Sequence, residues 1–128
     1  MQLLLEETGA PNHAAGLDSI TFLRDPFPVL NQTNLSLGPD RNTRVLVFVG
    51  NLQLQPNDTA AAVMVSLVGS NDQQYEIPAE NVWFYSNSDL QFSHVSFRLP
   101  NTLASGVCKI QIKVHGEISN IGFIQIKP

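Results

Sequence analysis

The 128-residue chain has few charged residues and almost no cysteine. Charged side chains make up 14% of it, where a typical globular domain has about a quarter. Seven Lys and Arg against eleven Asp and Glu give a net charge of -4, which argues against tight binding of nucleic acid through its phosphates. Cys108 is the only cysteine, so the sequence excludes an internal disulfide and a cysteine-based zinc site.

Long apolar runs are also missing. No stretch of the sequence approaches the roughly twenty apolar residues that a membrane-spanning helix needs, so we expect no membrane span. The start lacks the basic residues and long apolar core of a signal peptide, because Leu3 to Leu5 are followed at once by Glu6 and Glu7. This indicates either a cytosolic protein or a module of a larger exported chain. We favour the exported module, because the chain stops directly after a strand-like run at 124–128.

What the sequence has instead is alternation of apolar and polar residues, the pattern of half-buried strands. It is clearest over 107–115, where the even-numbered residues from Cys108 to Val114 are apolar or thiol-bearing. Turn signals separate the strand-like runs roughly every ten residues. The pattern predicts an all-β fold, an immunoglobulin-like antiparallel β-sandwich of about seven to nine strands, with a closed barrel as the alternative. The other predicted strands are 19–23, 45–49, 62–68, 75–77, 82–85, 92–99 and 121–126.

Two positions interrupt the alternation. Phe92 and Val95 are out of phase, which predicts a bulge in that strand. Gly122 interrupts the last strand and predicts either a bulge or a close approach of another segment. We expect the last two strands to form a closing hairpin through the turn at 116–117.

The N-terminal segment stands apart from this pattern. We divide the chain into an apolar strand with a flexible tether at 1–17 and the sandwich at 18–128. Leu3, Leu4 and Leu5 are candidate interface residues, because an apolar strand must bury its side chains. We favour their use as the first strand of the same sandwich. The alternative is pairing with the sheet edge of another copy, which would build filaments by β-strand addition.

The segments 25–27, 42–52 and 99–120 resemble immunoglobulin-like modules of the IPT/TIG class. These modules occur near the ends of large exported or surface proteins of soil bacteria. Their final hairpin has the form strand, Gly-x-x-Ser-Asn, strand, and Gly116 to Asn120 matches it. The resemblance covers 17–128 and implies an exported, non-catalytic building block, located outside the cell or on its surface. Its partners would be other protein modules or copies of itself.

The sequence offers little for catalysis or metal binding, so we expect no enzyme and no cofactor. His94 and His115 lie on polar strand faces without a third ligand at metal spacing, and Cys108 falls on an inward face, where a thiol is unreactive. No nucleophile and base form a recognisable pair, which ranks a small hydrolase last. Calcium binding stays an open alternative where the loops at 57–58 and 71–72 each carry an Asn-Asp pair, although no calcium-loop motif supports it.

Aromatic residues carry the second functional hypothesis. Trp83 and Tyr85 share one face of a predicted strand, and Tyr75 is nearby in the sequence. Such side chains can stack on sugar rings, so they are candidate polysaccharide contacts. The alternative, which we favour from the sandwich fold, makes Trp83 the core tryptophan. The sequence thus predicts an extracellular structural or adhesive module, and a carbohydrate-binding module as the second possibility.

Overall fold

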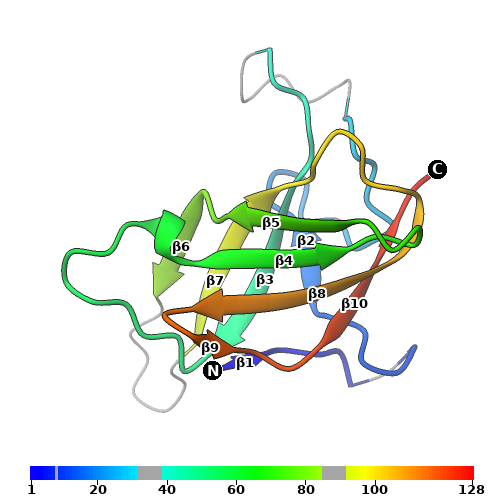
Figure 1. Cartoon of the computed structure of the whole chain (residues 1–128). Coiled ribbons are helices and arrows are strands. Elements are labelled where there is room, and N and C mark those ends of the chain that lie inside the picture. The colour runs from blue at the N-terminus through cyan, green and yellow to red at the C-terminus, as the bar shows by residue number, and fades with distance from the viewer. Residues whose placement is uncertain (8, 32–38, 85–91) are drawn as a thin grey trace.

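The computed structural model describes residues 1–7, 9–31, 39–84 and 92–128, which form two facing antiparallel sheets (Figure 1). In the first sheet the order is β1-β3-β7-β6, and β2 also pairs with β3. In the second sheet the order is β10-β8-β4-β5, and β9 also pairs with β8. The first sheet consists of β1 (Gln2–Leu3), β2 (Gly16–Asp18), β3 (Arg44–Gly50), β6 (Asn81–Phe84) and β7 (Phe92–Arg98). The second consists of β4 (Met64–Val68), β5 (Gln74–Pro78), β8 (Gly106–Val114), β9 (Glu117–Ile118) and β10 (Gly122–Ile126), and one helical turn, η1 (Ala60–Ala62), precedes β4.

This strand order is that of an immunoglobulin-like sandwich. With β1, β3, β4, β6, β7, β8 and β10 taken as strands A to G, one sheet reads A-B-E-D and the other reads G-F-C, with β5 beside C. The all-β immunoglobulin-like prediction is therefore confirmed. The described residues form ten strands, more than expected from the sequence, because β1 and β9 are paired pieces of only two residues each.

The core lies between the sheets and is made by the predicted alternation. In β8, Cys108, Ile110 and Ile112 point inward and are fully buried. They face β3, whose Val45, Val47 and Val49 are also fully buried; the pairing of β3 with β7 adds Val95 and Phe97. Burying one such side chain contributes about 1.5–3 kcal/mol, so the alternating strands supply most of the driving force for the fold.

The bulge predicted in the strand at 92–99 is wrong. β7 pairs with β3 without interruption from Gly50 opposite Phe92 to Arg44 opposite Arg98. Ser93 takes the inward position, because its buried hydroxyl donates to the Val49 carbonyl oxygen at 3.3 Å. Phe92 therefore lies on the outer face of the sheet.

The strand predicted at 19–23 is also wrong, because the chain turns after β2. The Asp18 carboxylate accepts hydrogen bonds from the backbone N–H of Ile20 at 2.9 Å and of Thr21 at 3.2 Å, which fixes an Asx-type turn. The apolar side chains that follow, Phe22 and Leu23, are exposed. The turn thereby places apolar side chains at the border of the first sheet.

At Gly122 the N-terminal segment packs closely against β10. Of the two alternatives that the sequence left open, a bulge or a close approach, the structure shows the close approach. Its strand pairs with β8 without interruption, from Gly122 opposite Ile110 onward. A Cβ atom on Gly122 would lie 2.8 Å from Leu3 Cδ2 and 3.0 Å from Ala14 Cβ. Only glycine leaves room for both neighbours.

The first strand packs within its own chain. Leu3 is 0% exposed and belongs to the core, Leu5 is half-buried, and Leu4 is 37% exposed. The Asn120 side chain brackets the backbone of Leu3: its Oδ1 accepts from the Leu3 N–H at 2.7 Å, and its Nδ2 donates to the Leu3 carbonyl at 3.1 Å. Residues 1–17 thus supply β1 and most of β2, and both strands pair with β3.

Candidate functional site

A groove of about 360 Å³ lies on the outer face of the first sheet, beside Trp83. Strands β3, β6 and β7 form its floor, and the turn after β2 forms one wall. Leu46 and Ser96 are the buried floor residues, while Ile20 and Phe22 supply apolar surface from the turn. The lining is completed by Ser19, Arg44, Glu80, Asn81, Trp83 and His94.

Trp83 is an exposed aromatic residue on a rigid strand. In the register of β6 with β7 it lies opposite His94, and the two rings meet edge to face with centroids 6.2 Å apart. Its side chain is 62% exposed, so the interpretation as a core tryptophan is wrong. Val82 faces inward instead, because it pairs with the buried Val95 of β7 and neighbouring residues of a strand point to opposite sides.

Arg44 anchors the polar end of the groove. Its guanidinium donates to both carboxylate oxygens of Glu80, from Nε at 2.7 Å and from a terminal nitrogen at 3.2 Å, and also donates to the Asn42 carbonyl at 2.9 Å. The Glu80 hydrogen bond outweighs burial and raises the pKa of Arg44. The Glu80 carboxylate is thereby held in place and remains partly open to solvent, available as an acceptor at the groove.

Two arginines lie directly opposite each other at this end, Arg44 on β3 and Arg98 on β7. Like charges in that position destabilise a sheet. Asp40 offsets the repulsion, because one of its oxygens accepts from Arg44 at 3.1 Å and from Arg98 at 3.0 Å. The Arg44 hydrogen bond, followed by that of the Asn42 backbone N–H, holds the pKa of Asp40 well below its ordinary 3.8.

This carboxylate gives a pH-dependent prediction. A lowered pKa in the folded state stabilises the protein above the ordinary pKa, and the contribution is lost as the pH falls through and below 3.8. Asp40→Asn should lower the melting temperature at neutral pH and differ less from the wild type in acid. Thermal unfolding at both pH values measures this, with the exposed turn variant Asp72→Asn as control. An equal difference at both pH values would contradict it.

His94 contributes a neutral ring to the groove. Burial lowers its pKa below the ordinary 6.5, so the imidazole is uncharged at neutral pH and can donate or accept a hydrogen bond. Together with the Trp83 indole, the Glu80 carboxylate and the Asn81 amide, the groove offers a flat apolar surface bordered by hydrogen-bonding groups. Across 1–7, 9–31, 39–84 and 92–128, no group of three His, Cys, Asp or Glu side chains is placed to hold a metal ion.

The other predicted aromatic contacts do not join Trp83. Tyr75 lies on β5 in the second sheet, where it packs against the core and its hydroxyl hydrogen-bonds the Thr102 hydroxyl at 2.9 Å. Tyr85 lies outside the described residues. Phe84, which the sequence analysis did not select, is 54% exposed next to Trp83.

The remaining candidates are placed as follows. The loop pairs 57–58 and 71–72 lie at opposite ends of β4, and Asp58 is hydrogen-bonded to the His115 ring at 2.6 Å. The structure therefore does not bring the two pairs together. Cys108 points inward as predicted, and burial raises its pKa to about 12.

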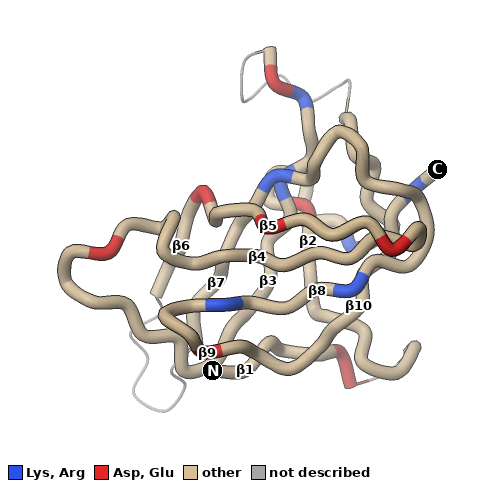
Figure 2. Tube along the Cα trace, viewed as in Figure 1, with Lys and Arg blue, Asp and Glu red and all other residues tan. Residues whose placement is uncertain are grey.

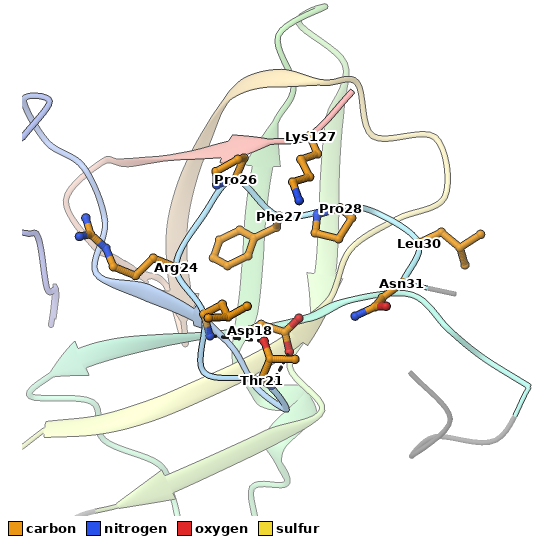
Figure 3. A pocket seen from close by; sticks show the side chains of 10 residues that line it. Asp18, Thr21, Arg24, Pro26, Phe27, Pro28, Leu30, Asn31 and Lys127 are labelled. Atoms are coloured by element: carbon orange, nitrogen blue, oxygen red, sulfur yellow. Dashed lines mark hydrogen bonds between the residues drawn. The ribbon is translucent and has the colours of Figure 1, made fainter. Parts of the chain in front are cut away.

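A second hollow of about 540 Å³ lies between the turn after β2 and the end of the chain. Figure 3 shows the Phe27 ring in its centre, with Asp18 and Thr21 on one side and Lys127 on the other. Phe27 belongs to the core, and the Asp18 carboxylate is engaged in its own turn. Arg24 extends away from Phe27 (Figure 3). Its guanidinium forms an ion pair with Glu6. The Asp18 and Arg24 side chains of this hollow thus serve local structure, and we take the groove beside Trp83 as the candidate site.

Over the part of the chain that the structure describes, the charged residues do not single out another surface. Acidic and basic residues are interspersed along the trace (Figure 2). None of the described helical segments is long and apolar enough to cross a membrane.

Topology and core thus define the class of this protein, an immunoglobulin-like β-sandwich. Compared with protein-family models, with curated proteins and with solved structures, the chain matches none of them. The resemblance to IPT/TIG modules therefore stays a prediction.

Proposed function

We propose that the chain is a non-catalytic adhesive module, acting outside the cell or on its surface, that binds carbohydrate in the groove beside Trp83. The supporting observation is the large exposed indole, held by β6 above a groove of about 360 Å³. Trp83 shares this groove with the exposed side chains of Ile20 and Phe22, and exposed apolar side chains that adjoin one another typically mark a site of contact. The groove volume falls within the range of small-ligand sites, about 300–1,000 Å³.

In the proposed complex, different groove residues make the apolar and the hydrogen-bonding contacts with the sugar. The apolar face of a sugar ring stacks on Trp83, where it removes both surfaces from water. The Glu80 carboxylate, fixed by Arg44, and the Asn81 amide then bond to ring hydroxyls. Because both lie on or beside the paired strand β6, little conformational entropy is lost on binding.

Fluorescence tests this proposal directly, since Trp83 is the only tryptophan. Titration with soluble polysaccharides, chosen by a glycan array, should give a saturable change in its emission. Trp83→Ala should weaken binding at least about thirtyfold, the effect of losing an aromatic anchor of about 2 kcal/mol. Binding of this variant is followed by calorimetry.

Phe84→Ala is the matched control, because Phe84 is the adjacent exposed aromatic residue and does not line the groove. It should bind as the wild type does. Unresponsive Trp83 emission with every glycan, or equal weakening by both variants, would contradict carbohydrate binding in this groove.

Self-assembly through the N-terminal strand is the less favoured part of the sequence hypothesis. It requires Leu3 to leave a position where it is fully buried in its own chain. We therefore propose that the module acts as a single sandwich, whose partners are other modules or polysaccharide.

A further inference from the structure

The outer edge of β10 is fully covered by the N-terminal part of the chain. Every second N–H along this edge points away from β8. These are the N–H groups of Phe123 and Gln125 in β10 and of Lys127 just after it. These groups donate in order to the Asn12 carbonyl at 2.9 Å, the Asp25 carboxylate at 2.8 Å and the Phe27 carbonyl at 2.8 Å. A free sheet edge invites pairing with another strand. Only the middle N–H is covered by a side chain, and that side chain is Asp25.

Asp25 is held in turn by a histidine placed between two carboxylates. The His13 ring nitrogens lie 2.6 Å from Asp25 Oδ2 and 2.8 Å from Glu6 Oε2, and all three side chains are largely buried. Arg24 also pairs with Glu6. β10 contributes the uncharged Gln125 beside these side chains. Lys127, the charged residue that follows the strand, lines the neighbouring hollow.

His13 belongs to an N-terminal hairpin, which we define as the described residues 4–7 and 9–15. Its two arms are joined by hydrogen bonds from the Ala15 N–H to the Leu4 carbonyl at 3.0 Å and from the Glu6 N–H to the His13 carbonyl at 2.7 Å. The Ala14 N–H donates to the Phe123 carbonyl at 2.9 Å. The hairpin therefore spans from the first sheet to β10, and His13 sits where it meets the edge.

The charge of the His13 imidazole decides whether it can donate hydrogen bonds to both Asp25 and Glu6. Carboxylates only accept hydrogen bonds, and a neutral imidazole has one N–H. One of its two short contacts would then set a ring lone pair against a carboxylate. Only the imidazolium donates to both. Burial lowers the pKa of His13, but the hydrogen bonds to Asp25 and Glu6 outweigh it and raise the pKa above 6.5.

We propose that the His13 imidazolium is a pH-sensitive latch that holds the N-terminal hairpin and Asp25 on the β10 edge. Loss of its proton weakens both contacts and uncovers the Gln125 N–H, the one edge donor that Asp25 covers. The stabilisation is complete below pH 6.5 and is lost as the pH rises through the raised pKa of His13. The latch is independent of the groove beside Trp83.

Two NMR measurements on the full chain test the latch. Titration of the His13 ring should give a pKa above 6.5. Amide hydrogen exchange, corrected for the intrinsic pH dependence, should show Gln125 losing protection across the same titration. The loss should be about tenfold for each unit by which the pKa is raised. Amides of β8 serve as the internal reference, because that strand lies inside its sheet.

Two variants separate charge from packing. His13→Gln should abolish the pH dependence of Gln125 protection and leave it low at every pH. His115→Gln is the matched control, because His115 also contacts a carboxylate, that of Asp58, but on the exposed surface. It should behave as the wild type. A His13 pKa at or below 6.5, or Gln125 protection that ignores the His13 titration in the wild type, would overturn the proposal even if the His13 variant did not fold.

Discussion

Replacing Leu3 by alanine is expected to lower the free energy of unfolding by about 2–5 kcal/mol, the range for truncating a fully buried leucine. The side chain is 0% exposed and packs in the core, although its strand pairs with β3 over only two residues. Lost burial and the cavity left between the sheets both contribute. Equilibrium unfolding in denaturant measures the change.

Leu4→Ala is the matched control, one residue away and 37% exposed. It should change stability by less than about 0.5 kcal/mol. The wild type and both variants should have the mass of one chain in solution. Deletion of 1–16 should lower the free energy of unfolding at least as much as Leu3→Ala does. If Leu3→Ala were as mild as Leu4→Ala, or if the deletion changed the mass but not the stability, the strand would pack on another copy.

The fold could be predicted from the sequence because its long strands carry their own pattern. In β8 every second residue from Cys108 to Val114 is buried, so alternation alone located the strand and its inward face. β3 was located by a different signal, the continuous apolar run from Val45 to Val49, which is typical of a strand inside its sheet. Such positions are determined locally, because one face of a paired strand meets the core and the other meets water.

The errors arose where a distant partner decides the environment. Ser93 is polar yet faces inward, since it reaches the Val49 carbonyl across the sheet. Trp83 is apolar yet faces outward, because its neighbour Val82 pairs with the buried Val95 and takes the inward side. Neither fact is visible in the local pattern.

The latch at His13 was missed for a similar reason. Asp25 and Gln125 are 100 positions apart in the sequence, and no spacing rule connects them to His13. The available signal was a histidine between acidic residues in a segment that must cover a sheet edge. Similarly, the groove combines residues from three strands and a turn, and only Trp83 was selected beforehand.

Gly122→Ala is expected to destabilise the protein by about 1–3 kcal/mol, the usual effect of overfilling a packed site. The added methyl would lie 2.8 Å from Leu3 Cδ2 and 3.0 Å from Ala14 Cβ. Leu3 has no free space to turn into because it is fully buried, and the Ala14 methyl moves only with its backbone. Gly50→Ala is the control: its nearest neighbour would be at 3.7 Å, an ordinary contact. Denaturant unfolding of both variants makes the comparison.

Combining Gly122→Ala with Leu3→Ala tests whether the two effects share one contact. In the Leu3→Ala background the Cδ2 atom is gone, so Gly122→Ala should cost less than in the wild type. A favourable coupling of about 0.5–3 kcal/mol is typical of residues in direct contact. Because the approach to Ala14 remains, the rescue should be incomplete. Strict additivity would place Leu3 away from Gly122 and contradict the close approach of β1 to β10.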